Sequence, residues 1–246
     1  MKSQEIDYYD YWQKNRKQNE GLLDREIESI KLISKVLKKG SKVLDLGCGN
    51  GNFLLALEKK FAIKGKGIDG SKAEVKEARG KGALVSGGDL QKPLNLKEKS
   101  DIIYSGEVLE HLFNPDFFLE QCNRTLKEGG FLVLSTPNLC AWFNRILMPL
   151  GIQPLFLEPS TKSKFVGAGF LKRFKKDSNP VGHVRVFCYD GLKDLLEMHG
   201  FKILELRGSI FDEGFPKNVL IVDRIFKNFP KMSAHFVILA KKVKEI

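Results

Sequence analysis

The sequence predicts an α/β fold in which helices cover both faces of a twisted, mostly parallel sheet. Short apolar runs typical of buried strands alternate along the chain with segments whose apolar residues recur at helical spacing. The first run ends in closely spaced glycines, which are typical of a sharp strand-to-helix turn. With 246 residues and a 42% hydrophobic composition, the chain can bury the core of one large domain. We therefore expect a single domain over residues 1–246.

The individual elements follow from the spacing of apolar residues. A helical pattern over residues 22–37 belongs to an N-terminal helical region, residues 1–40. Strands are predicted at residues 42–47, 64–69, 83–89, 101–106 and 131–136. Helices are predicted at residues 52–61, 71–82 and 114–130, the last ending in a Gly pair suited to a C-cap. Strands and helices in alternation imply right-handed crossovers between parallel strands.

The alternation stops after residue 138. Residues 139–182 contain aromatic side chains, four prolines and the basic run FLKRFKK, with no clear strand. We interpret this segment as a lid inserted over the edge at which the strands end. A helix at residues 189–200, a strand at 201–209, a mixed segment and a last strand at 234–242 complete the domain.

Composition argues against several classes of protein. The four cysteines form no CxxC pair, so they indicate neither a zinc site nor a disulfide framework. The N-terminus lacks the apolar core of a signal peptide, and no apolar run approaches the roughly 20 residues of a membrane span. These features predict a cytoplasmic protein without a transmembrane segment. The net charge of +11 would suit nucleic acid or an anionic membrane, but lysines spread along helical segments are also typical of solvated faces.

The most informative stretch is VLDLGCGNGNF, residues 43–53. Its glycines let a ligand approach the backbone, and the helix behind them offers free N–H groups and a partial positive charge. Asp69 ends the next strand 24 residues after Asp45, near the roughly 20-residue distance at which an acid binds a ribose diol. Asp89 ends the third strand, where its carboxylate could accept from an adenine amino group. A glycine-rich turn alone also fits a nicotinamide or flavin enzyme, or a structural turn.

Taken together, these strand ends resemble those of class I S-adenosylmethionine-dependent methyltransferases, from residue 40 to near the C-terminus. The resemblance implies a Rossmann-like, doubly wound, seven-stranded sheet whose last strand is antiparallel. It implies S-adenosyl-L-methionine as the methyl donor. It also implies a set of cofactor-binding residues at successive strand ends: Asp45, Gly47, Cys48, Gly49, Asn50, Asp69, Gly70, Ser71, Asp89, Leu90 and Gly106.

The stretch SGEVLEHLFNP, residues 105–115, follows the fourth strand and contains Glu107, Glu110 and His111. On a helix, their spacing would place all three on one face. With LKEGGFLVLSTPN and HVRVF, this stretch resembles the ubiquinone-biosynthesis O-methyltransferases and the type 11 and 12 methyltransferase-like proteins. In that branch a Glu-x-x-Glu-His run is associated with a divalent metal, and His183 would complete the ligand set. Carboxylates and imidazoles suit Mn²⁺ or Zn²⁺ at least as well as Mg²⁺.

Three roles are open for these residues. In the first, which ranks highest, Glu107 caps a helix, Glu110 forms a salt bridge and His111 packs over the cofactor. In the second, His111 is a general base that Glu107 or Glu110 orients. In the third, Glu107, Glu110, His111 and His183 bind a divalent metal. His199, near a helix end, and His235, in the last strand, are predicted to be structural.

The sequence therefore predicts methyl transfer to an oxygen of a small or lipid-like acceptor. The apolar residues of the insertion favour an aromatic or prenylated acceptor, and Arg145 with the basic run could hold this surface against anionic lipid as a peripheral membrane contact. Two alternatives are ribose 2′-O-methylation of RNA with a divalent metal, and binding of S-adenosylmethionine without catalysis. The aromatic stretch YYDYWQKNR could close over the cofactor as a flap.

Overall fold

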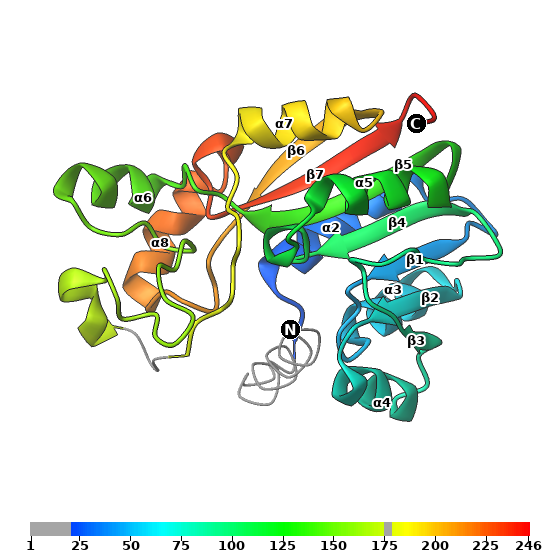
Figure 1. Cartoon of the computed structure of the whole chain (residues 1–246), viewed down its shortest axis with the longest axis horizontal. Helices are drawn as coiled ribbons and strands as arrows, with labels where there is room; N and C mark the ends of the chain where they lie inside the picture. Colours follow the sequence, from blue (N-terminus) through cyan, green and yellow to red (C-terminus); the bar gives the residue numbers. More distant parts are fainter. Residues whose placement is uncertain (1–20, 175–178) are drawn as a thin grey trace.

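The computed structural model describes residues 21–174 and 179–246. These residues form a seven-stranded sheet in the order β3-β2-β1-β4-β5-β7-β6 (Figure 1). The strands are β1 (Val43–Leu46), β2 (Gly65–Asp69), β3 (Val85–Gly87), β4 (Ser100–Gly106), β5 (Leu126–Pro137), β6 (Phe201–Ser209) and β7 (His235–Lys242). The helices are α2 (Asp24–Val36), α3 (Asn52–Phe61), α4 (Lys72–Gly80), α5 (Pro115–Thr125), α6 (Trp142–Leu147), α7 (Tyr189–Met198) and α8 (Lys217–Phe226). The aromatic flap predicted at the N-terminus lies outside the described residues.

The pairing of the strands confirms the predicted sheet. Strands β1 to β5 pair in parallel, and β7 is antiparallel to both β5 and β6. The chain runs outward from β1 through β2 to β3, then returns to place β4 on the other side of β1. The strand order therefore reverses between β1 and β4, which is where open α/β sheets bind ligands beyond the carboxyl ends of their strands.

Helices cover both faces of the sheet. Helices α5 and α7 pack on one face through fully buried residues such as Leu119 and Leu196. Helices α2 and α3 pack on the other face through Leu32 and Leu57, which are also fully buried (Figure 1). The two apolar layers hold the sheet rigid, so the side chains at its carboxyl edge have fixed positions.

The helix predicted over residues 114–130 is shorter than expected. Asn114 caps it, because its Oδ1 accepts from the backbone N–H of Phe117 at 3.0 Å, but the helix ends at Thr125. Leu126 is fully buried and pairs with Ser100, so the chain is already extended there. The glycine pair that was predicted as a C-cap lies inside β5, where a register shift marks an irregular pairing with β4. Burial of Leu126 and its strand pairing outweigh the local preference of the glycine pair for a helix C-cap.

The insertion leaves the sheet at the carboxyl end of β5. Its described part contains α6 and the 3-10 turns Met148–Leu150 and Gly169–Phe174. The mixed segment after β6 folds as α8, which packs on α6: the ring of Trp142 stacks on Phe226 at 5.2 Å, and its Nε1 donates to Asp223 at 2.7 Å. Helices α6 and α8 lie together at one end of the molecule (Figure 1). A lid function for residues 139–182 stays a prediction.

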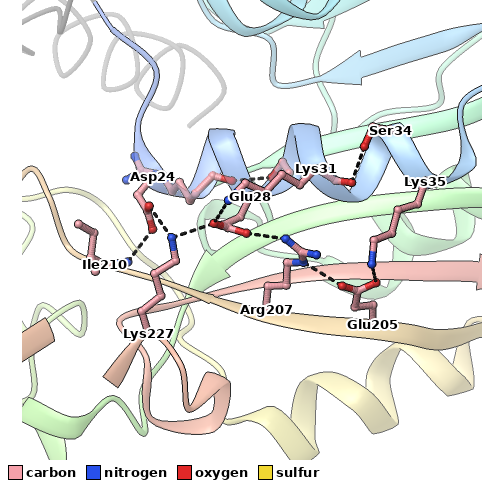
Figure 2. Close-up of polar contacts among 11 residues, drawn as sticks. Asp24, Glu28, Lys31, Ser34, Lys35, Glu205, Arg207, Ile210 and Lys227 are labelled. Carbon is pink, nitrogen blue, oxygen red and sulfur yellow. Dashed lines mark hydrogen bonds and ion pairs between the residues drawn. The ribbon is translucent and has the colours of Figure 1, made fainter. Parts of the chain in front are cut away.

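Polar contacts fasten α2 to β6 and to the chain after α8 (Figure 2). The buried Glu28 carboxylate accepts from Lys227 Nζ and from Arg207 Nη1, each at 2.8 Å. Lys227 Nζ also donates to Asp24 at 2.6 Å. These contacts hold the start of α2 near the carboxyl edge of the sheet. Arg25, the residue after Asp24, contacts the site described below.

Candidate active site

The glycine-rich turn lies directly after β1. Gly47 has a left-handed backbone, φ +84°, and a Cβ added there would lie 2.3 Å from Cγ2 of Val108. Only glycine therefore fits at this position without displacing Val108. The backbone N–H groups of Gly47 and Cys48 both donate to the carbonyl of Ile68, at 2.8 and 3.2 Å. The turn thus touches both β2 and the segment after β4.

Two of the predicted acids organise the strand ends around this turn. Asp69 accepts from the backbone N–H of Gly49 and of Ser71, each at 2.8 Å. These two bonds fix the carboxylate at the end of β2, which is the position expected for an acid that binds ribose hydroxyls. Asp89 accepts from the backbone N–H of Gln91 at 3.0 Å. It also pairs with Lys92, which together with the Gln91 bond lowers the pKa of Asp89 against the effect of burial.

The remaining predicted cofactor residues lie along the same edge. Cys48 and Leu90 are buried, and Gly106 has no room for a side chain, because an added Cβ would lie 2.1 Å from the Tyr104 hydroxyl oxygen. Asn50 and Gly70 lie in the loops after β1 and β2, and Asn50 Nδ2 donates to Glu77 at 3.2 Å. The structure therefore brings the predicted cofactor set to one edge of the sheet.

Asp45 is the carboxylate of this edge that most requires a ligand. Its side chain is 1% exposed, and no described residue donates a hydrogen bond to either oxygen. Burial, and then the neighbouring Asp69 carboxylate, raise the pKa of Asp45 well above its usual value. A cationic group bound at this edge would remove that penalty. S-adenosylmethionine carries an ammonium and a sulfonium, so the residues present fit it.

The stretch after β4 differs from the predicted helix. Glu107 has a left-handed backbone, φ +55°, and only Leu109–His111 form a 3-10 turn. Glu107, Glu110 and His111 therefore do not share one face of an α-helix. Glu107 does not cap the turn either, because its carboxylate accepts from the Ser135 hydroxyl at 3.0 Å. The prediction of a helix was wrong because a non-glycine residue in a left-handed conformation interrupts the spacing.

Three of the four proposed metal ligands nevertheless come together. Glu110, His111 and His183 each offer one ligand atom, and these atoms lie within 4.8 Å of one another. The ring centroids of the two imidazoles are 4.9 Å apart. Glu110 is completely buried: its Oε2 accepts from the Thr136 hydroxyl at 2.9 Å, and its Oε1 receives no hydrogen bond from the described residues. His111 Nε2 lies 4.0 Å from that oxygen.

The orientation of both imidazoles follows from their backbone partners. Nδ1 of His111 lies 3.2 Å from the carbonyl of Gly182, and Nδ1 of His183 lies 2.7 Å from the carbonyl of Phe156. A carbonyl can only accept, so each Nδ1 carries the hydrogen and the lone pair is on Nε2. A backbone partner on one ring nitrogen is the usual arrangement behind a metal-binding histidine. The donor set therefore fits a divalent metal such as Zn²⁺ or Mn²⁺.

The pKa values of Glu107 and Glu110 are shifted in opposite directions. Burial, and then the Glu107 carboxylate, raise the pKa of Glu110 well above its usual value. Burial alone would also raise the pKa of Glu107, but the Arg25 guanidinium, together with the Ser135 hydrogen bond, outweighs it and lowers the pKa. Glu107 is therefore ionised and paired, and it lies outside the group of three ligand atoms. Burial lowers the pKa of His183, which keeps its imidazole neutral.

Sequence reasoning missed the residues around Glu107. Arg25 Nε lies 3.7 Å from a Glu107 oxygen, and Arg25 Nη2 donates to Glu213 at 2.8 Å. His235 Nε2 lies 3.6 Å from the same Glu107 oxygen, and burial lowers the pKa of His235 to about 4. His235 was predicted to be structural; its strand is correct, but its side chain faces the site. Because β7 runs antiparallel to β5, its first residue meets Pro137 at the carboxyl edge.

Comparison with known proteins identifies the family. A profile described as "Methyltransferase domain" matches residues 12–206 of the chain. The chain belongs to this methyltransferase family. With the fold described above, the match makes it a class I S-adenosylmethionine-dependent methyltransferase, so the predicted family and methyl donor are confirmed.

Named relatives include two O-methyltransferases. The chain is 33% identical over 121 residues to the ubiquinone biosynthesis O-methyltransferase of Chelativorans sp. (strain BNC1), covering 46% of this chain and 45% of that protein. It is 30% identical over 166 residues to the mitochondrial ubiquinone biosynthesis O-methyltransferase of Schizosaccharomyces pombe, covering 63% of this chain and 60% of that protein. The chain thus matches only about half the length of these relatives.

A solved structure shares the fold. An S-adenosylmethionine-dependent methyltransferase from Methanosarcina mazei superposes with a TM-score of 0.62 at 18% identity, covering 86% of this chain and 97% of that one. At this identity the similarity concerns the fold alone.

Proposed function

We propose that the protein transfers the methyl group of S-adenosylmethionine to an oxygen of a small or lipid-like acceptor, beside a divalent cation held by Glu110, His111 and His183. The observation that carries the proposal is the convergence of these three ligand atoms within 4.8 Å. They lie next to the cofactor turn, because Val108 of the same stretch packs against Gly47. The names of the two O-methyltransferase relatives support oxygen as the acceptor atom.

The residues of the chain would mainly position the cofactor and the acceptor, and polarise the acceptor hydroxyl. S-adenosylmethionine supplies an activated methyl group with a good leaving group, so alignment accounts for much of the catalysis. Asp69 would hold the ribose, and Asp45 would face the cationic methionine end. A hydroxyl acceptor must also lose its proton, and a divalent cation lowers the pKa of an oxygen bound to it. Without a cation, the neutral imidazole of His111 would be the proton acceptor.

The surface at the α6 and α8 end favours a lipid-like acceptor. Residues 139–172 contain four Lys and Arg against one Glu, and residues 216–232 contain four Lys and Arg against one Asp. Large apolar side chains are more than half exposed on the same elements: Ile146, Met148, Leu150, Phe170, Ile221, Ile225 and Phe229. Exposed apolar groups among basic ones suit the surface of an anionic bilayer. No described helix is long and apolar enough to span one.

Ribose 2′-O-methylation of RNA is the second candidate. It uses the same cation site and the same basic surface. The two candidates differ in their dependence on salt: RNA binding weakens steeply as ionic strength rises, whereas an apolar acceptor binds as well or better.

A methylation assay with and without chelator tests the proposal. S-adenosylhomocysteine release would be measured with a lipid and metabolite extract, and separately with total small RNA, each with and without EDTA. We expect turnover on the extract and a loss of more than about tenfold with EDTA or in His183→Ala. The control variant is His199→Ala, because His199 pairs with Asp116 on α5 instead. EDTA-insensitive turnover would contradict the cation, and turnover on RNA alone would replace the acceptor class. Release on neither substrate would count against catalysis and favour simple binding of S-adenosylmethionine.

A further inference from the structure

The backbone partners of both site histidines come from the insertion. The carbonyl of Phe156 orients His183, and the carbonyl of Gly182 orients His111. Phe156 lies near the middle of the insertion, and Gly182 is its last residue. Neither carbonyl belongs to a helix or strand, so no regular hydrogen-bond ladder fixes it. Other contacts must therefore hold these two short segments in place.

The first segment is fastened to α6. Asn144, which is completely buried, accepts from the backbone N–H of Leu155 at 2.7 Å and donates to the Leu155 carbonyl at 3.1 Å. Phe156 follows with a left-handed backbone, φ +74°. A non-glycine residue in this conformation costs about 1–3 kcal/mol and persists only where its surroundings impose it. Here its ring packs on Phe211 at 4.8 Å and on His235 at 5.1 Å.

The second segment is fastened to the first by one side chain. The Glu158 carboxylate accepts from the backbone N–H groups of Val181 and Gly182, at 2.6 and 3.0 Å. Gly182 has a left-handed backbone, φ +83°, and successive N–H groups in such a turn converge on an anion. The next residues are tied to the site itself, because the Glu110 carbonyl accepts from the N–H groups of Val184 and Arg185, at 2.8 and 3.1 Å.

We infer that Glu158 is the positioning residue of the cation site. By joining the two segments, it presents the Gly182 carbonyl to His111 and places His183 against the Phe156 carbonyl. The inference rests on the proposed cation site and extends it: the insertion supplies the second layer of contacts behind two of the three ligands. Loss of such a contact typically weakens metal affinity about 10- to 100-fold.

Metal titration of the full chain and its variants tests this role. The probes are Mn²⁺, followed by the electron paramagnetic resonance of the unbound ion, and Zn²⁺, followed by competition with a chromophoric chelator. We expect Glu158→Ala to bind about 10- to 100-fold more weakly than wild type. Glu158→Gln should fall between them, because its amide oxygen can still accept from both N–H groups but carries no charge. The matched control is Glu120→Ala, because the partner of Glu120 among the described residues is Arg124 on the exposed face of α5.

A second readout separates this inference from the cation site itself. Two-bond ¹H–¹⁵N spectra of the imidazoles report which ring nitrogen carries the hydrogen, with no metal present. We expect His111 and His183 to be Nδ1-protonated in wild type and in Glu158→Gln, and to lose that preference in Glu158→Ala. Wild-type affinity and tautomers in Glu158→Ala would overturn the inference while leaving the cation site intact. If wild type bound neither ion, the proposed cation site would be wrong. The histidine tautomers alone would then show whether Glu158 positions the two imidazoles.

Discussion

Two buried carboxylates mark the site at the scale of single residues. Asp45 and Glu110 each have an oxygen that receives no hydrogen bond from the described residues. A buried polar group left in that state costs about 1–3 kcal/mol, and more when it is charged. Both residues lie toward the carboxyl edge of the sheet: Asp45 is near the end of β1, and Glu110 follows β4. Under the proposed function, ligands that bring positive charge would offset both costs: the cationic cofactor at Asp45 and a divalent cation at Glu110.

Replacing Asp45 with Asn separates ligand binding from stability. Removing the buried carboxylate should leave the melting temperature of the ligand-free protein unchanged or higher. The affinity for S-adenosylhomocysteine, which keeps the ammonium, should fall about 10- to 100-fold, since a charge-assisted hydrogen bond contributes roughly 1.5–3 kcal/mol. Calorimetric titration and thermal melting measure the two effects. Asp101→Asn is the control, because Asp101 pairs with Lys127 at the start of β4; undiminished affinity in Asp45→Asn would contradict the assignment.

At the scale of elements, α2 connects the fold to the site. One face of α2 packs on the sheet, and its polar side chains bind β6 and Lys227 (Figure 2). Arg25 follows directly after the bonded Asp24 and reaches Glu107. The charge state of Glu107 thus depends on the placement of a helix about 80 residues earlier in the chain.

The Glu28 network predicts a specific loss of stability in acid. Burial alone would raise the pKa of Glu28, but hydrogen bonds from Lys227, Lys31 and Arg207 lower it from 4.5 to about 2. The unfolded chain binds the proton more tightly, so this stabilisation is complete above about pH 5 and is lost as the pH falls from 4.5 through 2. It amounts to at most about 3 kcal/mol. Urea denaturation of wild type and Glu28→Gln at pH 7 and pH 3 measures it.

The outcome for Glu28→Gln follows from the same linkage. The variant should be less stable than wild type at pH 7, and the difference between the two should shrink at pH 3. Glu120→Gln serves as the control, because Glu120 pairs with Arg124 on α5, which packs on the opposite face of the sheet from α2. An equal difference at both pH values would show that the ionised carboxylate is not what fastens α2.

For the whole molecule, charge is distributed unevenly. The insertion and the segment around α8 carry most of the excess of basic residues, while the cation site contains Glu110 and lies beside Glu107. A divalent cation would bind at the proposed site by displacing the proton of Glu110, whereas the outer surface attracts anions. An anionic bilayer at the α6 and α8 end would place a lipid-like acceptor near the carboxyl edge of the sheet.

Vesicle sedimentation tests the outer surface. Wild type should sediment with vesicles of phosphatidylglycerol and phosphatidylcholine. The double variant Ile221→Gln, Ile225→Gln should sediment several-fold less, because burying each of these side chains in the bilayer contributes at most about 1.5–3 kcal/mol to the binding free energy. Leu84→Gln is the control, because Leu84 is equally exposed but lies between α4 and β3. Binding to RNA with a steep salt dependence, and none to vesicles, would favour the RNA alternative.

Features that depend on local spacing could be predicted from the amino-acid sequence. Apolar periodicity located the strands of the sheet, and the glycine turn with Asp45 and Asp69 located the cofactor edge, because these patterns lie within short stretches. Antiparallel pairing of the last strand followed from family resemblance and is confirmed. The 114–130 helix was overextended, since a buried Leu126 and its strand pairing outweigh local preference.

Which side chains meet in the site depends on long-range packing and could not be predicted from local patterns. Glu107 and Glu110 are close in sequence, yet a left-handed residue turns one toward Arg25 and His235 and leaves the other beside His111 and His183. Arg25, His235 and Glu158 carry no local pattern that points to a site. They reach it through the packing of α2, the antiparallel course of β7 and the fold of the insertion. Contacts between distant segments are set by the global packing of the chain, which periodicity and motif spacing do not encode.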